Sequence, residues 1–345
     1  MKGLFGKLFK KKEEPLRREE EERKASAKEA REEAEKRKGE EPTSNQDKSH
    51  FAFAYVWGKY REYALTSRKR KAELTAWRFR VLLFGITGAI FGTLCQESIR
   101  WGFNDISNLS WVPFILGLSS AAAMGFATYF GKELVNPYQE QRWIRSRSMA
   151  EALKSELYLF RANSPPYDTD RKPEKLIETV EELLKTVADL PPEISSKEQK
   201  QEGLPKEDLT VEDYIENRVN DQIVTFYRPQ SDELKQKMKR NKNIGLSLGC
   251  FSVILGALGL TGWTAGWIAV IGTITASITA FAYAGRYQYL IISYQTTADK
   301  LEQLCVLWKS KGKTDNDTRE RNEFIRECEA VISIENSAWM AEMTK

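Results

Sequence analysis

Residues Asn243–Gly285 read NIGLSLGCFSVILGALGLTGWTAGWIAVIGTITASITAFAYAG and contain no Asp, Glu, Lys, Arg or His. A helix that crosses the hydrocarbon core of a membrane needs about 20 mostly apolar residues. These 43 residues are therefore too many for one span and sufficient for two. The segment Thr261–Gly266, TGWTAG, supplies small, turn-forming residues near the middle. The stretch predicts a transmembrane helical hairpin with spans at about 244–261 and 265–285.

Two further uncharged blocks occur earlier in the chain, at Val81–Gln96 and Ile106–Gly131. The first is short for a span, but Trp77 and Phe79 extend it, and the adjacent arginines can reach the lipid headgroups. A helix in a soluble core also explains Val81–Gln96 when that block is taken alone. Together the two blocks predict a second hairpin, with spans at about 79–97 and 111–131.

The predicted fold is all-α: an integral membrane protein with two transmembrane hairpins, four spans in total, and long cytoplasmic helices. The mean hydropathy of −0.52 and the 30% of charged residues resemble those of a soluble protein. They are averages over uncharged blocks and strongly charged ones, and they do not describe either kind of segment. The apolar blocks therefore make a membrane protein the first functional class to consider, with the lipid bilayer as its first partner.

Lysine and arginine residues indicate the orientation, because loops on the cytoplasmic side carry an excess of them. They gather before the first span, after the second, before the third and after the fourth: Arg68, Lys69, Arg70, Lys71, Arg78, Arg80; Lys132, Arg142, Arg145; Lys239, Arg240, Lys242; Arg286. The loop inside the first hairpin has one arginine and the loop inside the second has no charge. This pattern predicts a multi-pass protein of the inner (plasma) membrane with both termini in the cytoplasm.

Aromatic residues occur near the ends of the predicted spans, where amphipathic rings favour the membrane–water interface. The sequence predicts an outer belt and an inner belt: Trp111, Trp263 and Trp267 outside, Tyr129 and Tyr283 inside.

Composition divides the chain into a charged tail, two similar halves and a linker. Residues 1–50 form a charged tail, in which Met1–Lys12 is either an interfacial anchor or a frayed basic end. Glu13–His50 is nearly all Glu, Lys, Arg and Ala and predicts disorder or a fragile single helix. Residues 51–190 and 211–345 each hold one hairpin, and 191–210 form a polar linker.

A weak repeat supports an origin of the two halves by duplication. Ala150-Glu151-Ala152-Leu153 and Ala298-Asp299-Lys300-Leu301 stand at similar positions after their hairpins, which predicts a tandem repeat. Leu176, Val180, Leu183, Val187 and Leu190 follow heptad spacing over Arg171–Leu190. Because only about two heptads are present, packing within the chain is favoured over a self-standing coiled coil.

Small residues recur four positions apart in every predicted span, an arrangement that lets helix backbones approach closely in lipid. The candidates for helix packing or oligomerisation are Gly88, Gly92, Gly117, Ala121, Gly125, Gly245, Gly249, Gly272, Ala276, Ala280 and Ala284. The spacing alone fits both packing inside each hairpin and assembly with other copies into a homo-oligomer.

The uncharged cores of the spans contain no Asp, Glu, Lys, Arg or His, which argues against a coupled transporter or pump. Hydroxyl groups that could line a pore occur in the second and fourth spans: Ser119, Ser120, Thr128, Thr273 and Ser277. Serine and threonine in isolated positions commonly bond back to their own helix instead, so both interpretations stay open.

The sequence predicts no catalytic, cofactor-binding or metal-binding residues. Its one histidine, His50, lies in the charged tail, which excludes histidine-based triads and clusters. The four cysteines have no CxxC spacing, and no phosphate-binding glycine loop is present. A net charge of +4 on 345 residues gives no indication of a nucleic-acid partner.

Residues Trp143–Asp168, WIRSRSMAEALKSELYLFRANSPPYD, resemble the SLATT family, two-transmembrane domains associated with SMODS nucleotidyltransferases and SLOG sensors. Ala298–Leu301 and the pair Glu335 and Trp339 are similar to the cytoplasmic helices of that family. The resemblance covers about 51–341 as two SLATT-type units in tandem, although Asn163-Ser164 stands where a glycine-containing turn is expected.

This resemblance implies a non-enzymatic membrane effector of prokaryotic conflict systems, such as antiviral defence. Such an effector would form an oligomeric pore when a cytoplasmic sensor or a nucleotide-signalling protein is triggered. The alternative is a non-conducting membrane scaffold that tethers a cytoplasmic partner through the charged helices.

Overall fold

The computed structural model describes residues 45–106, 108–194, 208–259, 264–312 and 317–343. The chain divides into two compact units, residues 1–51 and 52–345, and only residues 45–51 of the first are described. The described residues form helices and connecting turns without any strand, which confirms the predicted all-α class. The predicted disordered tail, apart from 45–50, and most of the predicted linker lie outside the described residues.

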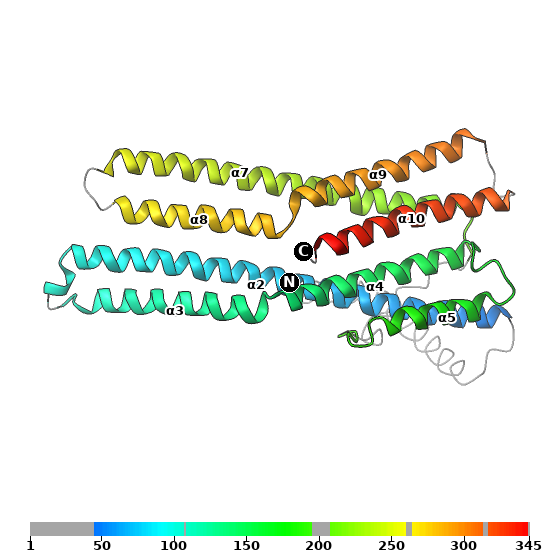
Figure 1. Ribbon diagram of the computed structural model, residues 1–345, viewed down its shortest axis with the longest axis horizontal. Coiled ribbons are helices and arrows are strands. Elements are labelled where there is room, and N and C mark those ends of the chain that lie inside the picture. The colour runs from blue at the N-terminus through cyan, green and yellow to red at the C-terminus, as the bar shows by residue number, and fades with distance from the viewer. Residues whose placement is uncertain (1–44, 107, 195–207, 260–263, 313–316, 344–345) are drawn as a thin grey trace, which may run out of the picture. The chain divides into compact units, whose positions relative to one another are not determined.

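The described part of the first half contains four α-helices. They are α2 (Asn45–Arg100), α3 (Trp111–Leu134), α4 (Pro137–Arg161) and α5 (Lys172–Lys185), with a short 3₁₀ turn, η1 (Phe103–Asp105), between α2 and α3. Helix α2 runs without interruption from a polar segment into the first uncharged block (Figure 1). Helix α4 begins after Asn136, whose side chain accepts a hydrogen bond from the backbone N–H of Gln139. This is a standard N-cap, and it lies two residues after the end of α3 at Leu134.

The second half repeats this order. It consists of α6 (Val211–Tyr214), two π-helical segments, η3 (Ile215–Asn220) and η4 (Gln222–Tyr227), then α7 (Arg228–Ala257), α8 (Thr264–Ala284), α9 (Tyr287–Ser310) and α10 (Thr318–Met343). Thr210 starts the segment with a capping box to Asp213. In both halves a long helix enters the apolar region, a second helix returns beside it, and two further helices follow (Figure 1).

Two tight turns use residues in the left-handed backbone region. Arg286, with φ 50°, joins α8 to α9, and a Cβ atom on the preceding Gly285 would collide with the Tyr287 ring. Asn163, with φ 48°, ends α4 where a glycine-containing turn was expected. Asparagine tolerates this conformation better than most residues, so it replaces glycine at that position without losing the turn.

Two hydrophobic cores hold the charged helices together, and α4 contributes to both. Leu153, Leu157 and Phe160 of α4 pack with α2 and α5 in the first core. Trp143 and Ile144, near the other end of α4, join the second core, which α9, α10 and the α6–η4 segment complete. Residues of the two sequence halves therefore pack together in the second core.

The predicted heptad positions of the first half pack within the chain. Leu176 and Val180 of α5 have no exposed surface and lie in the first core. Val187 and Leu190 are also buried there, although the helix ends at Lys185 and a series of turns carries them. Their burial supports packing within the chain, which was favoured over a coiled coil.

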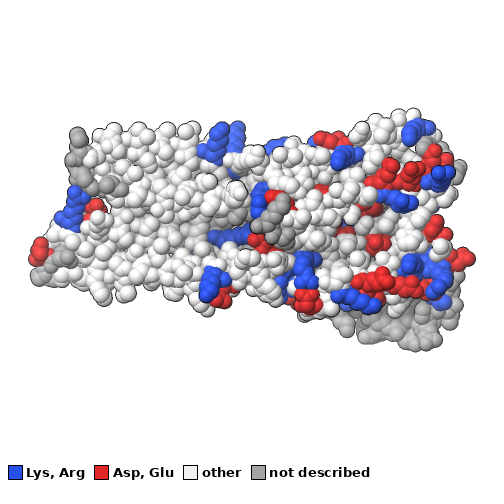
Figure 2. All heavy atoms as spheres, in the orientation of Figure 1, with Lys and Arg blue, Asp and Glu red and all other residues white. Residues whose placement is uncertain are grey.

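Three helical segments in the described part are long and apolar enough to cross a membrane: Gln46–Arg100, Trp111–Leu134 and Gly266–Ser310. Figure 2 shows charged side chains over α4, α5, α9 and α10, whereas the face over α3 and α8 carries almost none. Helices of this length and composition are typical of a membrane protein. The apolar part of α7 reaches only from Asn243 to Ala257 before the turn, so the fourth span stays a prediction.

Candidate functional site: an apolar hairpin surface and a buried charged cluster

Small residues bring α2 and α3 of the first hairpin into close contact. Gly88 is buried, and a Cβ atom at this position would lie 2.8 Å from a methionine side chain of α3. The Ser120 hydroxyl donates a 2.8 Å hydrogen bond to the Gly88 carbonyl. Gly92 also faces Ser120, and Gly117 faces Cys95. At these positions the small residues serve the approach of the two helices within one hairpin.

The second hairpin presents its small residues outward. A Cβ atom at Gly245, Gly249 or Gly272 would meet nothing within 4 Å. An open groove of about 710 Å³ runs along α7 and α8, lined by Gly249, Ser252, Gly272, Thr275, Ala276, Thr279, Ala280 and Tyr283. Ala121 and Gly125 of α3 are likewise exposed, and the side chain of Ala284 is outside the described part.

The hydroxyl groups predicted as candidates for a pore lining lie in three different settings. Thr128 and Thr273 each donate to the carbonyl four residues earlier in their own helix, at 3.0 Å. Ser120 lies in the contact between α2 and α3, and Ser119 and Ser277 are half-buried. In this structure three of the five hydroxyls therefore bond to helix carbonyls.

The aromatic residues predicted as interfacial belts lie near helix ends. Trp111, at the start of α3, is exposed, and its indole N–H donates to the carbonyl of Asn108 at 2.9 Å. Tyr129 and Tyr283 are exposed near the other ends of their helices, and Trp267 is half-buried. Trp263 lies outside the described residues. The exposed rings can lie in headgroups with their polar atoms toward water.

A buried carboxylate connects the two hairpins. Glu97, in the last turn of α2, is only 3% exposed. A Cβ atom added to Gly266, in the first turn of α8, would lie 4.0 Å from a carboxylate oxygen of Glu97. The same Cβ atom would lie 3.0 Å from the methyl group of Thr93. A negative charge is favourable beside a helix N-terminus. The burial of Glu97 depends on a helix about 170 residues away in the chain.

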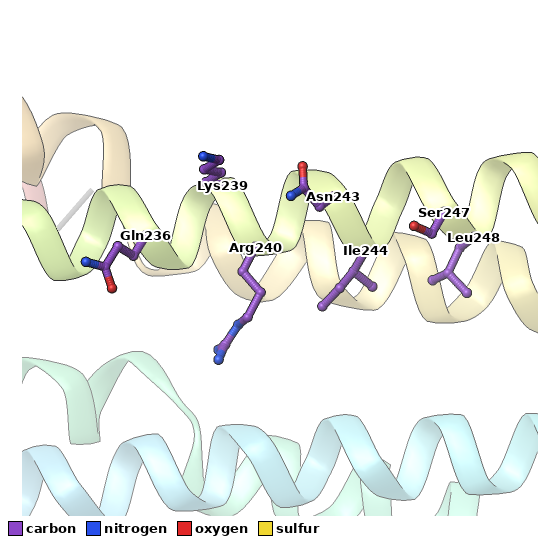
Figure 3. A pocket seen from close by; sticks show the side chains of 7 residues that line it. All are labelled: Gln236, Lys239, Arg240, Asn243, Ile244, Ser247 and Leu248. Carbon is purple, nitrogen blue, oxygen red and sulfur yellow. The ribbon is translucent and has the colours of Figure 1, made fainter.

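A shallow hollow of about 490 Å³ marks the boundary between the charged and the apolar part of α7. Figure 3 shows Arg240, Ile244 and Leu248 on one side of the helix, with Lys239 and Asn243 directed elsewhere. A cation thus precedes two apolar residues on the same helix face. Such a face fits a boundary between lipid headgroups and acyl chains.

A buried ion pair lies at the centre of the charged helices. Arg218 of η3 donates from Nε and Nη2 to the two carboxylate oxygens of Glu329 in α10, both at 2.8 Å. Arg218 has no exposed surface. The hydroxyls of Tyr214 and Ser155 also donate to Glu329, at 3.0 and 2.8 Å. The carboxylate therefore accepts hydrogen bonds from both sequence halves, because Ser155 belongs to α4.

Burial changes the proton affinities in this cluster. Desolvation, with the nearby Glu329 carboxylate, raises the pKa of Tyr214 well above its ordinary value, so its hydroxyl stays a donor. The pKa of Lys154 falls to about 8 because of desolvation and the Arg218 charge. The folded protein thus holds an ammonium group whose charge changes near physiological pH.

A second buried carboxyl group, Glu335, lies further along α10. Desolvation raises its pKa to about 7; the Arg147 charge opposes this shift and the Glu151 charge adds to it. The Arg147 guanidinium also lies 4.1 Å from the centre of the Trp339 ring. This cluster, like the first, joins α4 to α10.

Glu335→Gln is expected to stabilise the folded protein at pH 8 and to leave its stability nearly unchanged near pH 4.5. The folded-state pKa of about 7 exceeds the ordinary value of 4.5, so the folded protein holds a proton that the unfolded chain releases between these values. Wild-type stability therefore falls as pH rises through this interval, by about 3 kcal/mol in total. Thermal unfolding of the detergent-solubilised protein at several pH values measures the effect. Glu327→Gln, exposed on the same helix, is the control, and equal pH profiles for both variants would contradict the assignment.

The described residues contain no group of three or more His, Cys, Asp or Glu side chains arranged to hold a metal ion. Cys305 and Cys328 are buried free thiols, and desolvation raises the pKa of both. A protonated, buried thiol is a poor nucleophile. The described residues therefore provide an apolar surface that can contact lipid or protein. They also form a buried charged cluster that joins α4 to α10.

Comparisons with known families separate the two halves. Residues 214–339 match the family model of the SMODS and SLOG-associating 2TM effector domain 1. Residues 60–175 match a different family, DUF4231, described as a protein of unknown function. No match was found among curated proteins or among solved structures.

The matched segments refine the predicted resemblance. Arg218, Glu329, Glu335 and Trp339 all lie inside the SLATT-type segment, whereas Trp143–Asp168 lies entirely inside the DUF4231 segment. A SLATT-type unit is supported for the second half only, and the tandem arrangement stays a prediction. The chain therefore combines a region similar to a SLATT effector domain, at residues 214–339, with a region similar to DUF4231 at residues 60–175.

Proposed function

We propose that this protein is a non-enzymatic effector of a prokaryotic conflict system that oligomerises in the inner membrane and permeabilises it. The similarity of residues 214–339 to an effector domain carries the proposal. In the proposed topology four spans form two hairpins, and both termini are cytoplasmic. The excess of Lys and Arg at one end of the hairpins supports this orientation.

The groove of the second hairpin is the proposed contact between copies. In lipid the hydrophobic effect does not drive helices together, because the acyl chains are as apolar as the side chains. Tight packing of small residues drives helix association there instead. Gly88 and Gly92 are already occupied by contacts inside the first hairpin, whereas Gly249, Gly272 and Ala276 face open space. The second hairpin therefore offers the surface that another copy would need.

The charged helices are the proposed receiver of the trigger. Two buried carboxylates of α10 connect the second half to α4 of the first half: Ser155 of α4 donates to Glu329, and the charge of Arg147 of α4 acts on Glu335. A cytoplasmic sensor or nucleotide-signalling protein that shifts α10 would act on both halves. The shared order of helices in the two halves supports a tandem origin of this arrangement.

One observation favours a second function, a non-conducting scaffold that tethers a cytoplasmic partner. Thr275 and Thr279, which line the groove of the second hairpin, each donate their hydroxyl proton to the carbonyl four residues earlier in their own helix. With these two hydroxyls engaged, the remaining polar side chains of the lining are Ser252 and Tyr283, which provide little polar surface for ions.

Gly272→Leu with Ala276→Leu tests the effector proposal. The added side chains would fill the groove, and we expect about a tenfold loss of cross-linked oligomer, as a loss of about 1.4 kcal/mol in packing implies. Depolarisation of expressing cells, followed with a potential-sensitive dye after triggering, should fall with it. Ala122→Leu adds a side chain to an exposed small residue of α3 and is the control.

The two readouts separate the alternatives. Loss of both oligomer and depolarisation in the double variant, with neither lost in the control, supports the effector. Oligomers without depolarisation under any trigger support the scaffold. Unchanged cross-linking of the double variant would overturn the groove as the contact between copies.

A further inference from the structure

A second groove lies where the apolar hairpin of the second half meets the charged helices. It encloses about 660 Å³ between α7, α8, the start of α9 and the end of α10. Lys242 and Arg286 both line it. These two residues are also the charged residues that directly flank the uncharged stretch Asn243–Gly285. The groove therefore lies at the level where the hydrocarbon region ends and the headgroup region begins.

The side of the groove toward the uncharged helices is apolar. Gly245, Ile278 and Ala282 line it there. A Cβ atom at Gly245 would meet nothing within 4 Å, so α7 leaves room beside α8. Tyr283, at the edge, is exposed and carries a polar hydroxyl on an apolar ring. This part of the groove fits a hydrocarbon chain.

The opposite side carries donors for an anion. Lys242 is exposed, and within the described part of the chain it forms no ion pair. Arg286 uses Nη1 for a 3.0 Å ion pair with Glu342 of α10. A guanidinium group has five N–H donors, so its remaining donors can bind a second oxygen ligand. The backbone turn with φ 50° at Arg286 aims this side chain at the end of α10.

The charge balance of the groove favours an anion. Two cations, Lys242 and Arg286, stand against one carboxylate, Glu342. The carboxylate already accepts from Arg286, and Asn241 and Gln288 add neutral amide groups to the lining. A groove with a net positive polar side and an apolar side matches a molecule that joins a phosphate to an acyl chain.

We propose that this groove binds an acidic phospholipid, with its phosphate at Lys242 and Arg286 and one acyl chain along Ile278 and Ala282. The proposal rests on the four-span topology of the proposed function. Lipid binding at this site would tie α7, α8 and α10 together at the membrane boundary. A bound acidic lipid therefore stabilises the junction through which the charged helices act on the hairpin.

Native mass spectrometry of the full chain, released from micelles with added phosphatidylglycerol or phosphatidylcholine, tests the site. We expect wild type to retain phosphatidylglycerol in preference to phosphatidylcholine. Lys242→Gln should lower the retained phosphatidylglycerol about fivefold, the effect of one basic side chain on an acidic lipid. Arg240→Gln, two residues earlier on the same helix but outside the groove, should change it less than about twofold.

Lys242→Gln is the decisive variant because Arg286 also holds Glu342 in its ion pair. Equal losses in Lys242→Gln and Arg240→Gln would overturn the site, since general attraction to the basic boundary would explain them. Equal retention of the two lipids would also overturn it. A thermal stabilisation by inorganic phosphate alone that equals that of phosphatidylglycerol would indicate a free anion and overturn the lipid assignment. Depolarisation plays no part in this readout, so failure here is distinct from failure of the effector proposal.

Discussion

Arg218→Met is expected to lower the free energy of unfolding by about 3–5 kcal/mol, because it leaves the Glu329 carboxylate buried without its cation. Both carboxylate oxygens lie 2.8 Å from guanidinium nitrogens, and the two side chains are 0% and 5% exposed. Tyr214 and Ser155 also donate to this carboxylate, but neutral donors replace only part of a lost cation. Without the Arg218 cation, the folded state either keeps a buried unpaired charge and is less stable, or it takes up a proton at Glu329.

Chemical unfolding in detergent, followed by circular dichroism, measures this change. Arg228→Met is the control, because Arg228 forms ion pairs with Asp299 and Glu302 but is 39% exposed. Exposed pairs contribute about 1 kcal/mol or less. The double variant Arg218→Met with Glu329→Met should regain much of the lost stability, since it leaves no charge unpaired. If Arg218→Met and Arg228→Met cost the same, the ion pair is not the buried centre of this bundle.

Trp339→Ala should also destabilise the protein by about 3–5 kcal/mol, the range for removing a large aromatic side chain from a core. Trp339 is 1% exposed and packs edge-to-face on Trp143 of α4, with ring centres 5.5 Å apart. It also lies against the Arg147 guanidinium. Its removal leaves a cavity where the two sequence halves meet, and α10 should loosen from α4.

Hydrogen exchange of α4 and α10, combined with thermal unfolding, measures this loosening. In Trp339→Ala, protection of the backbone amides should fall in both α4 and α10. It should stay unchanged in α3, which belongs to the first apolar hairpin. Trp101→Ala is the control, because Trp101 is 59% exposed in the turn after α2. Unchanged protection of α4 would show that Trp339 stabilises α10 alone and would contradict its role between the halves.

The helices themselves were predictable from local patterns. The uncharged stretch Asn243–Gly285 predicted two helices with a turn at Thr261–Gly266, and the structure has α7 ending at Ala257 and α8 beginning at Thr264. A long stretch without charged residues can be recognised from consecutive residues alone. Contacts between distant parts of the chain are not needed to predict its helices. The same reasoning placed the ends of α3 and α8 near the charged residues that follow their blocks, whereas α2 and α7 begin well before theirs.

The roles of individual small residues were not predictable in this way. Gly88 and Gly272 have the same spacing signal, yet a Cβ atom on Gly88 would lie 2.8 Å from a side chain of the neighbouring helix, whereas one on Gly272 would meet nothing within 4 Å. Spacing on one helix says which residues share a face. It says nothing about what that face meets, because the rotation of each helix depends on packing along its whole length.

The buried charges show the same limit. Arg218 follows Tyr214 by four residues and shares a face with it, which was the one local signal of burial. Its partner Glu329 lies 111 residues away, and Glu97 meets the start of α8 over a still longer separation. In the sequence these residues look like ordinary members of charged helices.

The sequence by itself determined that this is an all-helical membrane protein, where its uncharged helices lie and which residues bound them. These properties follow from the cost of placing charge and unpaired backbone in lipid, which acts on each segment separately. Only the tertiary structure decided which glycines are occupied, which carboxylates are buried and where Lys242 and Arg286 form one groove. Those outcomes depend on contacts between segments far apart in the chain, whose geometry no single segment encodes.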